Sequence, residues 1–299
     1  MSAWRAGWRK VAEKARPRLR RPPLLVLPAA GWFLWFLLAP LAIIFVYSFA
    51  SKGVYGGVVM KFSLSNYVRS ADLIYLHIFW NSIKLATLTA ASCLLIGYPM
   101  AYVMATASAR MRAFLLVMVV VPFWTNFVVR AYAVKVLLGE QGPVNALLAS
   151  FGLISEPVVF ANTAFAVWLG MVTNYLPFMV LPLYVSLEKF DFSLLEAARD
   201  LGASPVKVLF KVLVPLTKPG IVTGLVFTFT PALGEFVIPD LLGGAKTMLV
   251  GNLITEQFLK TRDWPFGSAL SLLLILTVTG SLVLYLRMEA RRQKAEEGA

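Results

Sequence analysis

The chain has 299 residues, of which 59% are hydrophobic and only 14% charged, and its formal net charge is +13 at pH 7. This composition is too apolar for an ordinary water-soluble domain and predicts an integral membrane protein. The sequence holds one cysteine, Cys93, and one histidine, His77, which excludes an intramolecular disulfide and argues against a metal-dependent or triad enzyme.

The apolar stretches indicate how many helices cross the membrane. A helix needs about 20 apolar residues to span a bilayer, and four uncharged stretches reach that length, at residues 22–51, 85–109, 157–187 and 264–286. Two shorter apolar stretches each continue past a single charge, Arg130 or Glu235, into more apolar sequence; they are residues 113–129 and 219–234. We therefore predict an all-α integral membrane fold with six transmembrane helices.

A basic segment, residues 1–23, precedes the first span. Trp4 and Trp8 lie four residues apart among arginines and lysines, which fits a short interfacial helix as well as it fits a disordered basic tail. The apolar stretch that follows is longer than the roughly 7 to 15 apolar residues of a cleaved secretory signal. We therefore expect it to remain in the membrane as an anchor.

The distribution of Lys and Arg predicts the orientation, because short positively charged loops are retained in the cytoplasm. With the N-terminus inside, 19 of the 28 Lys and Arg residues fall on the cytoplasmic side and six in the opposite loops. Both termini are then cytoplasmic, and the excess charge meets anionic lipid headgroups rather than nucleic acid. The predicted organisation is a basic N-terminal segment, a six-helix transmembrane domain with a cytoplasmic loop, and a cytoplasmic C-terminal tail, at residues 1–23, 24–288 (loop 186–219) and 289–299.

The loop of residues 186–219 encodes two short helices. Ser193 and Glu196 match a capping box, in which the two side chains satisfy exposed backbone amides at a helix start. Gly202 predicts the end of this helix, and Ser204 with Pro205 predicts the start of a second one. Four residues fall on one apolar face of the first helix: Leu194, Leu195, Ala198 and Leu201.

This helix, glycine, helix pattern by itself is compatible with three interpretations. Small residues allow such a unit to press closely into a partner's groove, and an ordinary helical hairpin lying on its own membrane domain has the same spacing. A DNA-reading helix-turn-helix also uses such a turn. Its position between two membrane spans argues against that third interpretation.

The same loop resembles the EAA loop of the permease subunits of bacterial ABC importers. The resemblance rests on Glu196, Ala197 and Ala198, then Gly202, and further on Val212, Val214 and Pro215. The family pattern ends Ile-x-Leu-Pro, so the two valines are a mild departure. The resemblance implies a MetI-like permease bundle whose loop docks in a cleft of a separate ATPase, with a coupling surface made of Glu196, Ala197, Ala198, Leu201 and Gly202.

Two further stretches are similar to spermidine/putrescine permeases, namely VPFWTN at residues 121–126 and GEFVIPDLLGG at residues 234–244. Relatives for other cargos share parts of both. The resemblance implies a polyamine cargo, a bacterial inner-membrane location, cytoplasmic ATPase subunits that bind ATP and magnesium, an extracytoplasmic substrate-binding protein, and a second permease subunit that is a paralogue. Ferric ion, thiamine or another small cation stays open as cargo, as does a second copy of this chain as the partner.

Polar residues inside the predicted spans are candidates for a substrate path, because ionisable groups retained there usually face a cavity or the protein interior. Glu235 lies among prolines and glycines that interrupt the helix, and such a broken acidic segment suits a cation. Glu235 and Asp240 could provide counter-charges and Trp124 a π face. The alternatives are an internal pair of Glu235 with Arg130 or Lys84, an Asp240 at the headgroups, and a packing role for Trp124.

Asn174 and Tyr175 lie beside prolines of the fourth span, where they could reach a cavity or form hydrogen bonds between helices. We favour packing for this pair. No phosphate-binding loop is present, since GGAKT at residues 243–247 lacks the glycine that must precede the lysine. We therefore predict a non-catalytic transport subunit that works by alternating access and binds no cofactor itself. The rival hypotheses are a stand-alone secondary transporter or channel, which needs no docking loop, and a membrane enzyme, for which catalytic clusters are missing.

Overall fold

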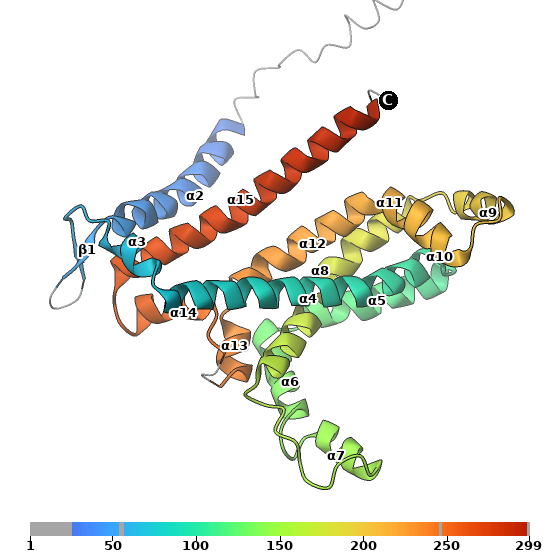
Figure 1. The fold of residues 1–299 in the computed structure, drawn as a ribbon, viewed down its shortest axis with the longest axis horizontal. Coiled ribbons are helices and arrows are strands. Elements are labelled where there is room, and N and C mark those ends of the chain that lie inside the picture. Colours follow the sequence, from blue (N-terminus) through green and yellow to red (C-terminus); the bar gives the residue numbers. More distant parts are fainter. Residues whose placement is uncertain (1–25, 54–56, 245–246, 298–299) are drawn as a thin grey trace, which may run out of the picture. The chain divides into compact units, whose positions relative to one another are not determined.

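The computed structural model describes residues 26–53, 57–244 and 247–297, and these are almost entirely helical (Figure 1). The segment around Trp4 and Trp8, for which an interfacial helix and a disordered tail were both open, lies outside the described residues. The chain divides into two units, residues 1–46 and 47–299. Helix α2 (Val26–Ser48) begins in the first unit. Most of its side chains, including the paired rings of Trp32 and Phe36, are exposed, as expected for a helix that meets lipid.

The second unit contains a short hairpin and the remaining helices. Its antiparallel strands are β1 (Ser51–Lys52) and β2 (Val58–Val59), with Ser51 paired to Val59. The helices up to the 186–219 loop are α3 (Ser65–Ser70), α4 (Leu73–Thr106), α5 (Ala109–Trp124), α6 (Phe127–Leu137), α7 (Pro143–Ser150) and α8 (Ala164–Glu188). The rest are α9 (Ser193–Asp200), α10 (Pro205–Val208), the π-helical turn η1 (Leu209–Leu213), α11 (Val214–Leu216), α12 (Lys218–Leu233), α13 (Val237–Leu242), α14 (Val250–Leu259) and α15 (Trp264–Glu297).

The four long uncharged stretches form the four longest apolar helices, which confirms those predictions. Helices α2, α4, α8 and the segment Trp264–Val283 of α15 are long and apolar enough to cross a membrane. Two bent helix pairs bring the number of spans to six if each pair is one span. The described part of the chain therefore carries four to six candidate spans.

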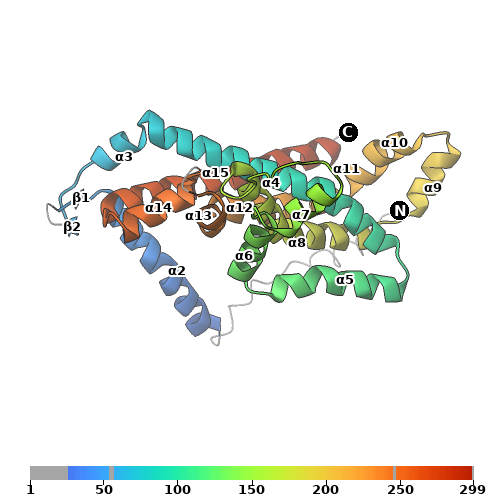
Figure 2. The same ribbon diagram turned by 90° about the horizontal axis from the view of Figure 1, so that it is seen from below.

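The third stretch is not the continuous helix that the sequence predicted. It breaks between α5 and α6 with a bend of 97°, and Figure 2 shows the two helices meeting at this corner. The break has a local cause. Pro122 lies inside the last turn of α5, and the Asn126 side chain caps α6 by accepting a hydrogen bond from the Val128 amide at 2.8 Å.

The fifth stretch begins after a 70° bend that separates Pro205–Leu216 from α12. It ends at Leu233, two residues before Glu235, and the chain resumes as the short helix α13. The predicted helix interruption around Glu235 is therefore confirmed.

Helices α4, α8 and α12 pack together as the centre of the second unit. Glycines make this packing possible. A Cβ atom at Gly224 of α12 would lie 2.6 Å from Met179 Sδ of α8, and one at Gly97 of α4 would lie 3.2 Å from the same methionine's side chain. Small residues at such crossings let helix backbones approach closely, which is the usual source of helix association in lipid.

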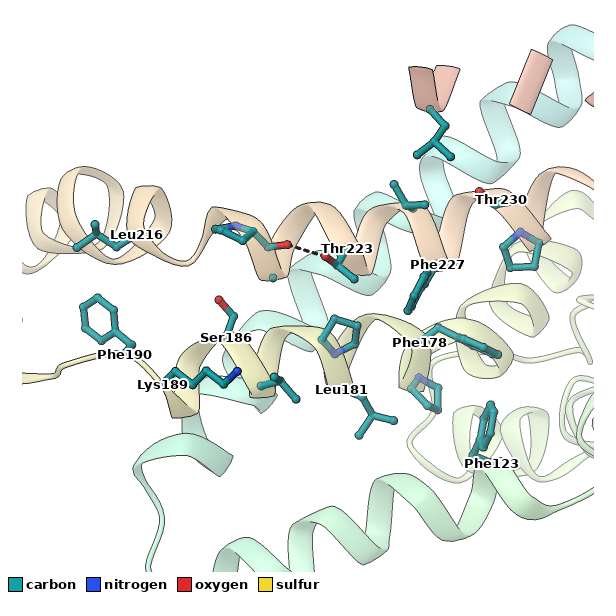
Figure 3. A pocket seen from close by; sticks show the side chains of 18 of the residues that line it. Phe123, Phe178, Leu181, Ser186, Lys189, Phe190, Leu216, Thr223, Phe227 and Thr230 are labelled. Carbon is teal, nitrogen blue, oxygen red and sulfur yellow. Dashed lines mark hydrogen bonds between the residues drawn. The ribbon is translucent and has the colours of Figure 1, made fainter. Parts of the chain in front are cut away.

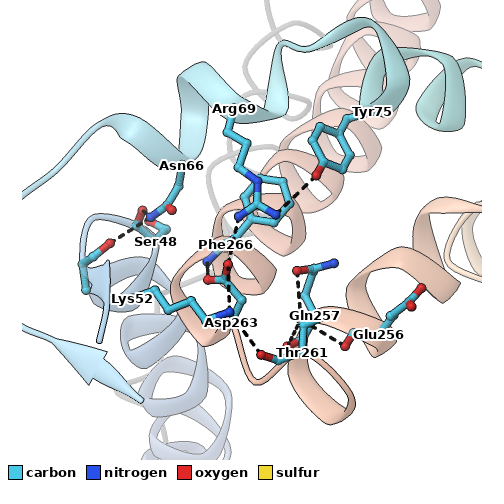
Figure 4. A network of polar contacts seen from close by, with 11 residues as sticks. Ser48, Lys52, Asn66, Arg69, Tyr75, Glu256, Gln257, Thr261, Asp263 and Phe266 are labelled. Atoms are coloured by element: carbon cyan, nitrogen blue, oxygen red, sulfur yellow. Dashed lines mark hydrogen bonds and ion pairs between the residues drawn. The ribbon is translucent and has the colours of Figure 1, made fainter. Parts of the chain in front are cut away.

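A polar network fixes the segment between α2 and α4 to the start of α15 (Figure 4). The buried Asp263 accepts a hydrogen bond from Arg69 Nη1 at 2.9 Å and lies 3.8 Å from Lys52 Nζ. The Arg69 guanidinium stacks 3.9 Å from the ring centroid of Phe266. Burial lowers the pKa of Arg69, but its hydrogen bonds to Tyr75 and Asp263 outweigh that effect and raise it. The guanidinium therefore stays charged.

Candidate functional site

The first candidate site is the 186–219 loop, and its first helix begins differently from the prediction. Ser193 is the first residue of α9, and its side chain makes no capping bond. Instead, Asp191 Oδ1 accepts a hydrogen bond from the Ser193 amide at 3.0 Å. Hydrogen bonds from the Ser193 hydroxyl and amide lower the pKa of the exposed Asp191 carboxyl. The capping box is thus wrong, because an acceptor two residues earlier reaches the same end of the helix.

The predicted end of this helix at Gly202 is confirmed. Gly202 has φ +81, and its amide bonds the Arg199 carbonyl at 2.8 Å, while the Ala203 amide bonds the Ala198 carbonyl at 3.1 Å. These two bonds form a Schellman motif, which requires a left-handed residue and therefore favours glycine. Ser204 and Pro205 start α10 as predicted, although the Ser204 side chain forms no capping bond.

The coupling residues implied by the resemblance lie on the outer side of the loop. Glu196, Ala197 and Gly202 are exposed, Ala198 is half-buried, and Leu201 is 89% exposed. The predicted single apolar face is therefore wrong. Leu195, at 5% exposure, and the half-buried Ala198 face the core, while Leu194 and Leu201 are exposed. An exposed leucine beside a tight turn gives the loop a projecting apolar surface.

The second candidate site surrounds Glu235, which is buried at 6% exposure. One of its carboxylate oxygens accepts a hydrogen bond from the Tyr175 hydroxyl of α8. The other, Oε1, accepts from the Val237 amide at 2.8 Å and the Ile238 amide at 3.2 Å. Glu235 thus caps the start of α13 and ties it to α8.

The internal ion pair of Glu235 with Arg130 or Lys84 is not formed. In the described residues, ion pairs join Asp263 to Lys52 and Arg69, and Glu188 to Arg112. Arg130 Nε and Nη1 are buried without a hydrogen-bond partner. Within the same residues no group of three or more His, Cys, Asp or Glu side chains is arranged to hold a metal ion.

The other predicted path residues are separate from this cluster. Asp240 is exposed on α13, and Trp124 is 82% exposed at the end of α5, next to the bend. Asn174 is buried at 1% exposure and donates a hydrogen bond to the Gly170 carbonyl of its own helix at 2.8 Å, while its Oδ1 has no partner. No hydrogen bond links these three side chains to Glu235 in the described part of the chain.

A large apolar cleft runs beside α8 and α12, and the sequence reasoning did not identify it. Its volume is about 1230 Å³. Figure 3 shows Phe178 and Phe227 projecting between these helices and Phe123 reaching the cleft from α5. Its charged lining residues are Lys189 and Asp191, both in the 186–219 loop. The sequence feature that could have indicated this cleft is the prolines inside both helices, of which Pro177 and Pro231 line it.

Comparison with known proteins gives a consistent family. Residues 22–294 match the model of the binding-protein-dependent transport system inner membrane component. The chain is 42% identical over 262 residues to the spermidine/putrescine transport system permease protein PotB of Haemophilus influenzae, covering 88% of this chain and 91% of that protein. It is 40% identical over 273 residues to PotB of Escherichia coli K12, covering 91% and 99%.

A solved structure has the same fold at lower sequence similarity. It is a bacterial ABC transporter involved in the import of the acidic polysaccharide alginate, with a TM-score of 0.69 and 20% identity, covering 98% of this chain and 99% of that one. A second structure, of a bacterial alginate ABC transporter in complex with an alginate-bound periplasmic protein, gives a TM-score of 0.70 at 19% identity over 90% and 93%. The predicted permease fold is confirmed.

The family also shows what kind of protein this chain is. Its members are membrane components of transport systems and not enzymes. This confirms the prediction of a transport subunit over the rival hypotheses of a stand-alone transporter and a membrane enzyme. It also confirms the predicted inner-membrane location. The chain belongs to the binding-protein-dependent transport system inner membrane components, the membrane-embedded permease subunits of ABC importers.

Proposed function

We propose that this permease translocates polyamines such as spermidine and putrescine, or a similar small cation, by alternating access. The observation that carries the proposal is the 40–42% identity, over about nine tenths of the chain, to permeases named for spermidine and putrescine. The extent of the match includes the two stretches whose sequences suggested this cargo, residues 121–126 and 234–244.

The energy for transport comes from a partner. We propose that separate ATPase subunits bind ATP and magnesium and dock on Glu196, Ala197, Ala198, Leu201 and Gly202. The exposed Leu201 and the tight turn at Gly202 support this docking, because a projecting apolar side chain on a rigid turn can enter a partner's groove at little entropic cost. A second permease subunit, a paralogue, and an extracytoplasmic substrate-binding protein complete the proposed assembly.

We assign the path of the cation to the region of Glu235, Asp240, Trp124, Asn174 and Tyr175. Glu235 supplies negative charge at the point where α12 breaks, although its carboxylate already accepts hydrogen bonds from Tyr175 and from α13. The exposed Trp124 ring presents a π face at the corner between α5 and α6. A carboxylate offers about four acceptor positions, and the three bonds to Glu235 leave one of them for an ammonium group.

Affinity purification tests the docking surface. The wild-type chain is isolated from its native membrane beside the double variant Glu196→Arg, Gly202→Trp, and accompanying proteins are identified by mass spectrometry. The matched control is Glu140→Arg with Gly152→Trp, since Glu140 is exposed and Gly152, like Gly202, has a positive φ and open space around it. We expect an ATPase with the wild type and the control and none with the loop variant.

Absence of an ATPase from all three preparations would overturn the importer assembly. The cargo is tested separately, by uptake of labelled spermidine and putrescine into cells that lack other polyamine importers. Uptake that depends on this chain supports the polyamine assignment. Uptake of another cation instead, with no effect of this chain on polyamines, would contradict it.

A further inference from the structure

Both ends of the 186–219 loop are linked to helix α4, one end through Arg112 of α5 and the other end directly. The first attachment is at Glu188, the last residue of α8. Its Oε1 accepts a hydrogen bond from Tyr184 at 2.7 Å and lies 3.3 Å from Arg112 Nη1. Arg112 also donates through Nη2 to the carbonyls of Ala105 at 3.3 Å and Ala107 at 3.5 Å, at the end of α4. A single guanidinium thus joins the ends of α4 and α8.

This contact is more than an exposed ion pair. An isolated surface pair adds little because solvent screens it and both side chains lose freedom. Arg112, however, satisfies carbonyls at a helix C-terminus, where a positive charge is favourable, and two of its three nitrogens have defined partners. Beside it, the ring of Phe192 in the loop meets Tyr102 of α4 edge-on, with ring centroids 6.0 Å apart.

The second attachment is at Thr217, where the loop ends. Thr217 is fully buried at the 70° bend before α12, and its Oγ1 lies 2.9 Å from the hydroxyl oxygen of Tyr98 in α4. The single Thr217 hydroxyl proton is directed to the Leu213 carbonyl at 2.7 Å. Tyr98 is therefore the donor in the bond to Thr217. This bond connects α4 to the point around which α12 turns.

Helix α4 then continues to the Glu235 region. Ser82 lies 16 residues before Tyr98, about 24 Å along a continuous helix, and its hydroxyl accepts a hydrogen bond from the Val250 amide at the start of α14 at 2.8 Å. In α14, the Asn252 side chain donates to the Phe236 carbonyl at 2.7 Å, one residue beyond Glu235. The covalent chain and these hydrogen bonds thus lead from the loop to the proposed cation path.

We propose that Tyr98 and Arg112 are positioning residues that hold the 186–219 loop to α4, so that displacement of the loop by the ATPase moves α4 together with α8 and α12. This rests on the proposed docking of an ATPase on the loop. Loss of either attachment lets the loop move without α4, and ATP hydrolysis then no longer drives transport with full yield.

The test uses the complete importer, purified with its ATPase, second permease and binding protein, in proteoliposomes. The variants are Tyr98→Phe and Arg112→Gln, and the readout is spermidine taken up per ATP hydrolysed. We expect both complexes to retain the ATPase and hydrolyse ATP while this yield falls by about fivefold, the factor expected from loss of one ordinary hydrogen bond. Arg112→Lys, which keeps the charge, is expected to recover part of the yield.

Two variants are the matched controls. Arg110→Gln changes an exposed arginine on the same helix as Arg112. Tyr67→Phe removes the 2.7 Å hydrogen bond from the Tyr67 hydroxyl to the Ser48 hydroxyl, far from the loop in sequence. Both are expected to keep the wild-type yield. An unchanged yield in Tyr98→Phe and Arg112→Gln would overturn the proposal while leaving the assembly intact. Absence of the ATPase from the wild-type complex would instead overturn the proposed function.

A distance measurement separates coupling from simple loss of stability. Spin labels are placed at Lys207→Cys in α10 and Val103→Cys in α4, both exposed positions. In the labelled chain without further substitutions, the separation of the labels is expected to be the same with and without ATP. When Tyr98→Phe and Arg112→Gln are added together, the separation is expected to change on ATP binding. A separation that already changes with ATP in the wild type would overturn the proposal.

Discussion

The hydroxyl of Tyr175 donates a hydrogen bond to the buried carboxylate of Glu235, and this bond joins α8 to the break between α12 and α13. The same carboxylate caps α13 through its other oxygen. Glu235, which is proposed for the cation path, therefore also has a structural role, because its hydrogen bonds hold α8 and α13 together. Substitutions that separate its acceptor role from its charge can distinguish these two roles.

Glu235→Gln keeps a carbonyl oxygen for the α13 amides but removes the charge, whereas Glu235→Ala removes both. If capping is the main role, we expect the glutamine variant to retain uptake and the alanine variant to lose about 1 to 2 kcal/mol of stability, as typical for a lost helix cap. Thermal unfolding of the purified chain and polyamine uptake measure the two effects. Equal loss of uptake in both variants, with normal stability in the glutamine variant, would identify the charge as the essential feature.

Tyr175→Phe leaves one Glu235 oxygen buried and without its donor. We expect a loss of about 1 to 3 kcal/mol, the usual cost of an unsatisfied buried polar group, seen as a lower midpoint of thermal unfolding. Tyr132→Phe is the control, because Tyr132 is 50% exposed. A Tyr175→Phe protein as stable as the wild type would show that this bond contributes nothing to the fold.

Gly202→Ala places a Cβ on a residue with φ +81, although no atom beyond the two adjacent residues lies within 4 Å of that position. The cost is therefore conformational, about 1 to 2 kcal/mol for a left-handed residue, and it falls on the turn that presents Leu201. We expect weaker ATPase binding in a titration of the purified complex. Gly152→Ala, at φ +67 and equally uncrowded, should leave that affinity unchanged.

Gly224→Val is expected to disrupt the packing of α8 on α12. The new Cβ would lie 2.6 Å from Met179 Sδ and 3.2 Å from the Met179 carbonyl oxygen. Overpacking of this kind costs about 1 to 3 kcal/mol, so the yield of monodisperse protein in gel filtration should fall. Gly280→Val, at a position with nothing within 4 Å, is the control and should behave as the wild type.

Asp191 gives the start of α9 a dependence on pH. Its folded pKa is depressed below the ordinary 3.8 by hydrogen bonds from Ser193. The contribution to stability is therefore fully present above the unfolded pKa and is lost as pH falls through the lower, folded pKa. NMR titration of the Asp191 carboxyl should give a pKa below 3.8 that returns toward this value when the chain is unfolded.

The sequence by itself determined the features that depend on local chemistry. Four spans follow from uninterrupted apolar length, because the bilayer sets the number of residues that a helix needs. The end of α9 follows from Gly202, since few residues other than glycine adopt its backbone conformation. The interruption beside Glu235 follows from the prolines and glycines around it.

Only the tertiary structure decided which groups meet. Tyr175 and Glu235 are 60 residues apart and Tyr98 and Thr217 are 119 apart, so no periodicity or turn signal connects them. The predicted capping box is wrong because Asp191 accepts the hydrogen bond at that helix end. The third apolar stretch is not one straight helix, because a capped corner at Asn126 bends it between α5 and α6. Hydropathy records how much surface a residue can bury in lipid or protein, whereas hydrogen-bond partners depend on which helix faces cross, and that geometry exists only after the helices have packed.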